Sequence, residues 1–334
     1  MGEFLSTPNK EKESFDNENE ILRFGSCGMQ GWRKRMEDAH LTDLDIGTKK
    51  DTQLFGVFDG HGGREVALFV GHHFTEELLK NPNFQKNDIK TALEENYLKM
   101  DEMMLEKEGR EELIQESKRS KEESAKLKEN TKNTQIEMLR EVIDPKEQPD
   151  AMISMFTGCT ANVLAIKDKK LYFANAGDSR GVLCKKGQAY PMSIDHKPEL
   201  PNELKRIERA GGWVSDGRVL GNLNLSRGLG DSEYKVDKSL KPDQQIISAF
   251  PDIKIESLDQ DCDFAVLACD GIWDCKTNQE VCDFFSERLK KNPNGKISKM
   301  IEELYDEILA PDVFTDTGVG CDNMSCIVIQ FKKK

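Results

Sequence analysis

Short, unbroken apolar runs recur along the chain and predict strands that other parts of the protein cover on both faces. Turn-forming or polar residues bound each run, as is typical of strands. The runs are LFGVF (54–58), TANVLAI (160–166), LYFANAG (171–177), GVLC (181–184), FAVLACDG (264–271) and CIVIQF (326–331). Because the connections between the runs at 160–184 are short, these strands are expected to pair antiparallel.

Other segments carry apolar residues at helical spacing. Val66, Val70, Phe74 and Leu78 recur every four residues and predict a helix that begins near Arg64. An Asn-Pro pair at 81–82 is expected to end it. Further helices are expected at residues 88–104, 278–290 and 297–309.

Two polar segments and a turn signal interrupt this pattern. Residues 1–20 are charged and poor in apolar side chains, so we expect a flexible tail. Residues 106–150 are dominated by Glu, Lys and Arg, which predicts either an exposed helix or a disordered insertion. The Asp216-Gly217 pair predicts the centre of a hairpin. We expect a single domain from residue 21 to residue 334.

Composition narrows the class of protein. The 334 residues are 37% hydrophobic, enough to build a large core, and no apolar stretch approaches the roughly 20 residues that span a bilayer. The formal net charge of −13 argues against nucleic acid as a partner, because phosphates would be repelled. Nine cysteines without a C-x-x-C pair favour a reducing compartment. We therefore expect a cytoplasmic monomer, with nuclear entry as an alternative.

The first residues match a short lipidation pattern. Met1-Gly2 with Ser6 fits the N-myristoylation motif, which makes Gly2 a candidate for acylation. A single acyl chain anchors only marginally, and the neighbouring tail is acidic. Weak membrane association is therefore expected only if Gly2 is acylated.

Three acidic residues stand at the ends of predicted strands. Asp59 and Asp270 each follow an apolar run, in Asp-Gly pairs, and Asp322 comes shortly before the last run. In antiparallel neighbours the end of one strand lies beside the start of the next, so the three acids can meet at one sheet edge. Clustered carboxylates repel each other unless a cation lies between them. Because the chain lacks a Cys or His cluster with zinc spacing, Mg²⁺ or Mn²⁺ is favoured.

The segment RKRMEDAH adds Glu37, Asp38 and Arg33 to the candidate site. An arginine beside two metal ions suits a bound phosphate, because its guanidinium is a planar fork of donors. Paired metals can also activate a water as a nucleophile. His61, two residues after Asp59, could protonate a leaving alkoxide.

Each of these features also has a purely structural interpretation. An Asp-Gly pair after a strand is commonly only a turn, and the basic residues can be solvated surface. A second chemical hypothesis is that Cys27, separated from Arg33 by five residues, attacks phosphate as a thiolate. That loop requires a helix start near the arginine, which the sequence does not show clearly.

The residues resemble those of a known family, the metal-dependent serine/threonine phosphatases called protein phosphatase 2C. The similarity extends over about residues 22–331, and the matching stretches run in the family's order. The chain departs from the family pattern in the charged insertion at 106–150 and at Cys159, where Ser is usual. The matching stretches are GMQGWRKRMEDAH, GVFDGHGG, GCTANVLAI, NAGDSRGVL, DHKP, KRIERAGGWV, LNLSRGLGD, LACDGIWD and DNMS.

The resemblance implies an α+β fold, a four-layer sandwich with two central antiparallel sheets flanked by helices on both sides. It also implies two Mg²⁺ or Mn²⁺ ions bridged by Asp59, and a flap at about residues 195–240. The Gly60 carbonyl would bind one ion and the carboxylates of Asp270 and Asp322 the other. Waters on the metals would be held by Glu37 and Asp38, and a weaker third ion would lie near Asp178, Asp270 and Asp274.

The implied reaction is attack of a metal-bound hydroxide on the phosphorus of phosphoserine or phosphothreonine in protein substrates. Arg33 would bind the phosphate and His61 would act as the general acid. The alternative is a catalytically silent relative that binds phosphoproteins as a scaffold. Such a relative is expected to lack a metal-binding acid, whereas this chain keeps Asp59, Asp270 and Asp322.

Overall fold

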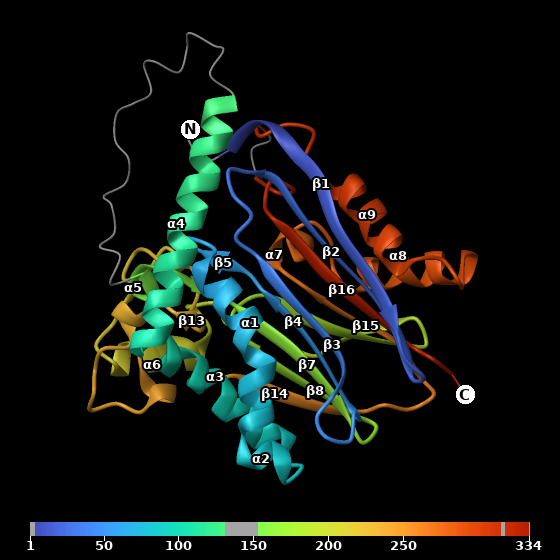
Figure 1. Cartoon of the computed structure of the whole chain (residues 1–334), viewed down its shortest axis with the longest axis horizontal. Coiled ribbons are helices and arrows are strands. Elements are labelled where there is room, and N and C mark those ends of the chain that lie inside the picture. The colour runs from blue at the N-terminus through green and yellow to red at the C-terminus, as the bar shows by residue number, and fades with distance from the viewer. Residues whose placement is uncertain (1–3, 131–152, 315–317, 334) are drawn as a thin grey trace.

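Two antiparallel sheets form the centre of the protein (Figure 1). The computed structural model describes residues 4–130, 153–314 and 318–333. Within these residues, the six-stranded sheet has the order β1 (Phe4–Glu18), β2 (Leu22–Arg33), β16 (Met324–Phe331), β15 (Cys262–Ala268), β9 (Arg180–Lys185), β10 (Gln188–Pro191). In the same residues, the five-stranded sheet has the order β14 (Asp252–Ser257), β8 (Lys170–Ala176), β7 (Ala161–Lys167), β4 (Thr52–Phe58), β3 (Ala39–Ile46).

The apolar runs of the sequence lie in strands that bury both faces, as predicted. In β4, Phe55 and Val57 point into the layer between the two sheets, whereas Leu54 and Phe58 point toward the helices. Successive side chains of a strand alternate between its faces, so a strand between two apolar layers needs apolar residues at every position. This requirement explains why LFGVF shows no polar alternation.

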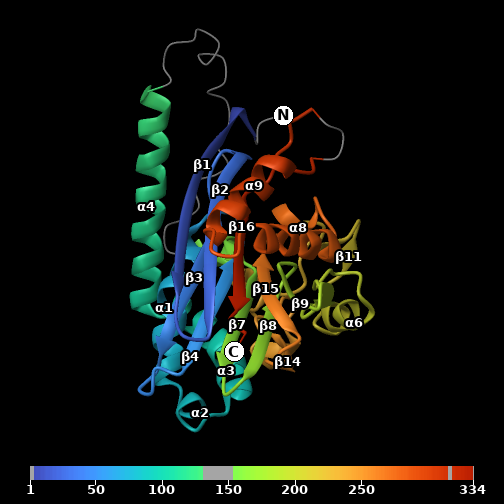
Figure 2. The same cartoon turned by 90° about the vertical axis from the view of Figure 1, so that its right-hand side faces the viewer.

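Helices cover the outer face of each sheet, which completes the four predicted layers. In Figure 2, α1 (Glu65–Lys80) and α4 (Lys107–Asn130) lie on one side of the sheets, and α8 (Asn278–Lys291) and α9 (Ile297–Ile308) lie on the other. The remaining helices are α2 (Pro82–Gln85), α3 (Ile89–Leu105), α5 (Ile153–Phe156), α6 (Pro201–Arg209) and α7 (Asp270–Trp273), with short 3-10 turns η3 (Ser232–Tyr234) and η4 (Pro242–Gln244).

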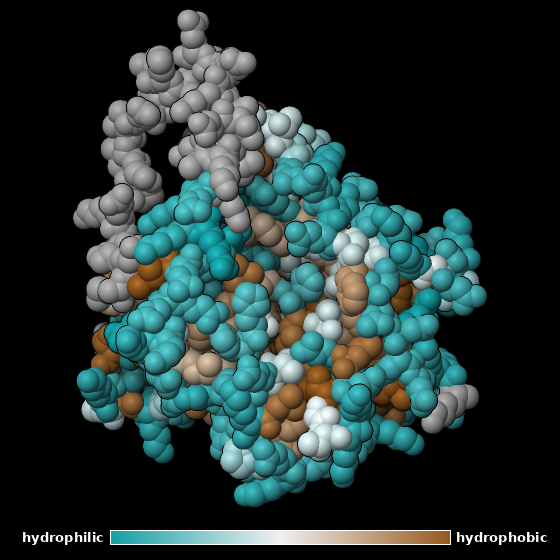
Figure 3. Space-filling view, viewed as in Figure 1, coloured by the Kyte–Doolittle hydropathy of each residue, from teal (hydrophilic) through white to brown (hydrophobic). Residues whose placement is uncertain are grey.

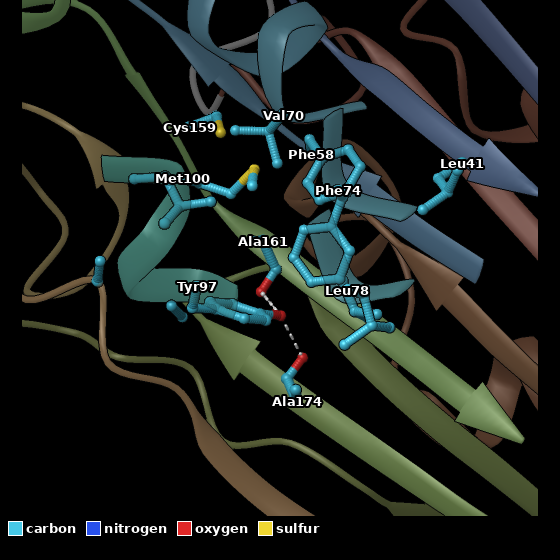
Figure 4. Close-up of a cluster of buried hydrophobic side chains, with 14 of the residues drawn as sticks. Leu41, Phe58, Val70, Phe74, Leu78, Tyr97, Met100, Cys159, Ala161 and Ala174 are labelled. Atoms are coloured by element: carbon cyan, nitrogen blue, oxygen red, sulfur yellow. Dashed lines mark hydrogen bonds between the residues drawn. The ribbon is translucent and has the colours of Figure 1, made fainter. Parts of the chain in front are cut away.

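The layer between α1, α3 and the five-stranded sheet is closed by large side chains (Figure 4). Phe74 of α1 and Tyr97 of α3 meet edge to face, with ring centroids 5.5 Å apart. The Tyr97 hydroxyl lies 2.9 Å from the Ala174 carbonyl oxygen and 3.2 Å from that of Ala161. Tyr97 therefore binds α3 to the neighbouring strands β7 and β8.

Two smaller sheets are also present in the part of the chain that the structure describes. One joins β5 (Gly60–His61), β6 (Gly158–Cys159) and β13 (Leu229–Gly230). The other is the hairpin of β11 (Val214–Ser215) and β12 (Arg218–Val219), which confirms the predicted Asp216-Gly217 turn. The segment at 195–240 contains α6, this hairpin and η3. Its residues Ile207, Val219 and Tyr234 form a small core together with Ile247, which follows the segment.

The prediction of a flexible tail at residues 1–20 is wrong for residues 4–18, which form the edge strand β1. The polar sequence fits this position, because an edge strand is held mainly by main-chain bonds to one neighbour. Phe15 packs against Phe24, with ring centroids 5.9 Å apart. Two carboxylate oxygens of Asp16 accept from the Ser298 N–H (2.9 Å) and hydroxyl (2.5 Å) at the start of α9. Gly2 lies outside the described residues.

The charged segment 106–150 begins as a helix that is partly docked. The first half of α4 packs against α1, α3 and α5, with Leu113 buried in the core. Glu112 binds His73 at 2.7 Å, and Glu116 binds Arg64 at 2.7 Å. The predicted helix is confirmed over Lys107–Asn130. Its docking was not expected from the sequence, because these partners lie far away in the chain. Residues 131–150 lie outside the described residues.

The surface is polar over the face seen in Figure 3, where hydrophilic residues predominate and hydrophobic residues show between them. In the part of the chain that the structure describes, no helix has the length and apolar character needed to cross a membrane.

Asp16 provides a test of whether residues 4–18 form an ordered strand rather than a free tail. Asp16→Ala removes the acceptor for Ser298, a residue that is only 2% exposed, and should lower the free energy of unfolding by about 1–2 kcal/mol. Denaturant unfolding measures the change. Glu11→Ala, an exposed position on the same strand, is the control and should change stability by less than about 0.5 kcal/mol. Equal stabilities of both variants would show that residues 4–18 are a free tail.

Candidate metal-assisted active site

Asp59 leaves the end of β4 with its main chain held from both sides. The Asp59 N–H donates to Thr160 Oγ1 (3.2 Å), and the Thr160 N–H donates to the Asp59 carbonyl (2.9 Å). The next residue, Gly60, lies so close to the Glu37 carbonyl oxygen that a Cβ atom would stand 2.2 Å from it. Only glycine permits this approach. The Asp-Gly pair is therefore packed into the site and is more than a surface turn.

Asp270 and Asp322 come from two neighbouring strands of the other sheet. β15 and β16 are antiparallel, with Ala268 opposite Cys326. Asp270 follows β15 and Asp322 precedes β16, so both stand at the same edge, as predicted. Asp59 does not belong to that edge, because β4 lies in the five-stranded sheet. The expectation that all three acids share one sheet edge is thus corrected: the acids come from two facing sheets.

Asn323 fixes the loop that carries Glu37 and Asp38. Its side-chain amide donates to the carbonyls of Gln30 (2.8 Å) and Arg35 (3.0 Å), and its side-chain oxygen accepts from the Glu37 N–H (2.9 Å). Asn323 is buried and directly follows Asp322. One side chain thus ties the loop between β2 and β3 to the start of β16.

The acids lie close enough to disfavour one another's ionisation. Desolvation, followed by the charges of Asp270 and Asp38, raises the pKa of Asp59 well above its usual range. Desolvation and the charges of Asp178 and Asp322 do the same for the pKa of Asp270. Such mutual shifts are the signature of carboxylates that share a site.

Asp38 shows most directly that these residues suit a cation. Burial and the charge of Asp322 raise the pKa of Asp38 to about 7. Its Oδ2 atom is buried without a hydrogen-bond partner in the described part of the chain. A buried carboxylate oxygen without a donor is costly, and a divalent cation with oxygen ligands satisfies it. The oxygen-rich set therefore fits Mg²⁺ or Mn²⁺.

The side chains do not stand in a finished coordination shell. Over residues 4–130, 153–314 and 318–333, no three His, Cys, Asp or Glu side chains form a group that could hold a metal ion as they lie. Two of the acids contact cations of the chain. Arg33 Nη2 lies 2.5 Å from Asp322 Oδ2, and Lys197 contacts Asp178. Arg33 therefore does lie beside the acids, as predicted.

His61 lies in β5 and is held by an acid that the sequence analysis did not single out. Its Nε2 lies 2.8 and 2.9 Å from the two carboxylate oxygens of Asp231, a buried residue after β13. Desolvation lowers the pKa of His61, but the charge and hydrogen bond of Asp231 outweigh it, so the pKa is raised overall. A Cβ at Gly158 would stand 2.2 Å from Asp231 Oδ2, so the glycine of GCTA makes room for this pair.

Besides Asp270, the resemblance implies Asp178 and Asp274 at a third ion. Asp178 is buried in the turn between β8 and β9 and contributes to the raised pKa of both Asp59 and Asp270. Asp274 is exposed at the end of α7, beside a cleft of about 530 Å³.

The thiolate hypothesis for Cys27 is wrong. Cys27 and Arg33 both lie in the extended strand β2, which separates their Cα atoms by roughly 20 Å. Cys27 is 1% exposed, and burial raises the pKa of its thiol to about 11. It therefore packs as a core residue, far from a reactive thiolate.

Comparison with known proteins gives a consistent result. The family model of protein phosphatase 2C matches residues 22–116 and 106–316. Probable protein phosphatase 2C 6 of Paramecium tetraurelia is 46% identical over 332 residues, or 99% of this chain and 100% of that protein. Probable protein phosphatase 2C 21 of Arabidopsis thaliana is 45% identical over 337 residues, or 100% and 93% of the two chains.

Two crystal structures from Toxoplasma gondii share the fold. One is a phosphatase with a TM-score of 0.68 and 22% identity, covering 97% of this chain and 96% of that one. The other is serine-threonine phosphatase 2C, with a TM-score of 0.68 and 16% identity over 98% of each chain. At these identities the likeness concerns the fold alone. The family is shown by the matched family model and by relatives that are about 45% identical over nearly the whole chain. The chain therefore belongs to the protein phosphatase 2C family.

Proposed function

We propose that this protein phosphatase hydrolyses phosphoserine and phosphothreonine in proteins with the help of Mg²⁺ or Mn²⁺. The observation that carries the proposal is the meeting of Asp59, Asp270 and Asp322 beside Arg33. Desolvation and the charges of neighbouring acids raise the pKa of Asp59 and of Asp270. Such a group of acids next to a partly exposed arginine suits two kinds of ligand at once, a divalent cation and a phosphate.

The carboxylates of Asp59, Asp270 and Asp322, with the Gly60 carbonyl, would hold two metal ions. The carboxyls of Glu37 and Asp38 would orient water, and Asp178 with Asp274 would serve a weaker third ion. When bound, the ions supply an activated water for attack on phosphorus and offset the negative charge of the phosphate. Since Asn323 fixes the Glu37 loop, the water-orienting residues are held in place before substrate binds.

Arg33 would bind the substrate phosphate. Its guanidinium carries five N–H donors, one of which contacts Asp322, so donors remain for phosphate oxygens. The side chain is 44% exposed, which leaves it open to a ligand from solvent. A bidentate contact would orient the phosphorus relative to the acids.

His61 would act as the general acid. Asp231 holds the imidazole by two short contacts and stabilises its protonated form. A protonated imidazole can give its proton to the serine or threonine oxygen as the bond to phosphorus breaks. The alternative function, a silent scaffold, would use Arg33 for binding only.

Metal dependence separates the two functions. Purified protein should hydrolyse a phosphothreonine peptide in Mn²⁺ and lose that activity in EDTA. Asp59→Asn should lower kcat/KM at least roughly 100-fold, because metal stabilisation contributes several kcal/mol. Asp216→Asn changes the Asp-Gly pair at the tip of the β11–β12 hairpin and is the matched control. Full activity of Asp59→Asn would refute the assigned site, and an inactive wild type that still binds the peptide would favour the scaffold.

The role of Asp231 can be tested with two leaving groups. Asp231→Asn should lower hydrolysis of a phosphoserine peptide roughly 10- to 100-fold, since the alkoxide needs a proton. Hydrolysis of p-nitrophenyl phosphate should fall much less, because the phenolate leaves unprotonated. Asp101→Asn is the control. Asp101 lies in α3 and accepts hydrogen bonds from the Gly230 N–H and from Lys235, which flank Asp231 in the chain. If Asp231→Asn slows both substrates equally, Asp231 has only a structural role.

A further inference from the structure

Two exposed basic residues directly follow Arg33 in the chain. Lys34 and Arg35 leave the end of β2 in a bend and are both exposed. Neither forms an ion pair with the described residues. The side chains are therefore free to meet a charged ligand at the position where the chain passes from Arg33 to Glu37.

Three other basic residues of the described chain are paired with carboxylates. Arg180 makes two bonds to Asp195, of 2.7 and 2.9 Å. Lys197 contacts Asp178. Arg64, which directly precedes α1, binds Glu116 at 2.7 Å. Lys34 and Arg35 differ from these cations, and their free charge is notable in a chain with a net charge of −13.

The backbone beneath these two side chains is fixed. The side chain of Asn323 accepts a hydrogen bond from the Glu37 N–H and donates one to the Arg35 carbonyl. The loop is therefore bound on both sides of residue 36. A rigid loop presents its charges at a defined distance from Arg33, which favours selective binding over diffuse attraction.

We propose that Lys34 and Arg35 select substrates with acidic side chains close to the phosphorylated residue. The inference rests on the proposed function, because it assigns the phosphate to Arg33. An extended peptide advances about 3.3 Å per residue, so carboxylates within about three residues of the phosphate reach this pair. The acidic protein as a whole repels such peptides, and the two cations offset that repulsion locally.

The test compares two phosphothreonine peptides that differ only in their flanking residues, Glu in one and the neutral isostere Gln in the other. With Mn²⁺ at low salt, kcat/KM for the Glu peptide should exceed that for the Gln peptide by about three- to ten-fold, as expected for two exposed ion pairs. The ratio should shrink in 0.5 M NaCl, a concentration chosen because salt screens exposed charges.

The double variant Lys34→Gln/Arg35→Gln should bring this ratio close to one. The ratio of the two kcat/KM values is used because a loss of activity that affects both peptides equally cancels in it. Lys49→Gln/Lys50→Gln removes two exposed lysines from the turn between β3 and β4 and should leave the ratio as in the wild type.

The possible failures are distinguishable. If the wild type hydrolyses both peptides equally well in Mn²⁺, the inference is wrong and the proposed function stands. The inference is also wrong if the double variant keeps the wild-type ratio. If neither peptide is hydrolysed in Mn²⁺ or Mg²⁺, the proposed function fails and the inference fails with it.

Discussion

The repulsion between carboxylates gathered at one end of two facing sheets is the constraint on which this structure depends. Desolvation and neighbouring charges raise the pKa of Asp59 and Asp270, so holding these groups together costs stability. Three apolar layers offset that cost, because strands such as β4 bury side chains on both faces. A divalent cation among the oxygens would remove the repulsion. The apolar layers that stabilise the fold therefore also offset the cost of holding these carboxylates together.

Hydrogen bonds from distant side chains give the site its shape. Thr160 holds the main chain of Asp59, Asn323 holds the Glu37 loop, and Asp231 holds His61. Each of these residues contacts a strand end or loop other than its own, so the geometry is set by the docking of separate segments. The order of β1 has the same origin, since Asp16 reaches α9. Site and framework are therefore coupled through long-range contacts.

Much of this arrangement could be predicted from local patterns. The sequence predicts Asp59 and Asp270 as site residues because each follows an apolar run. It predicts the strands β4 and β16 because a strand between two apolar layers is apolar throughout. Asp231 and Asn323 were present in the quoted motifs LNLSRGLGD and DNMS, yet neither was singled out. Their roles depend on contacts with residues 170 and 286 positions away in the chain, which leave no periodic signal. A glycine opposite the His61 pair, Gly158, was the available hint.

The sequence by itself determined the kind of the strongly patterned elements, such as β4 and α1, because periodicity and turn chemistry act over a few neighbouring positions. Only the tertiary structure decided which sheet each strand enters. It placed β4 in one sheet and β15 with β16 in the other, so the acids meet between two layers. It also turned a charged, polar N-terminus into strand β1. Strand partners are chosen by hydrogen bonds and packing between distant segments, and a local pattern cannot encode that choice.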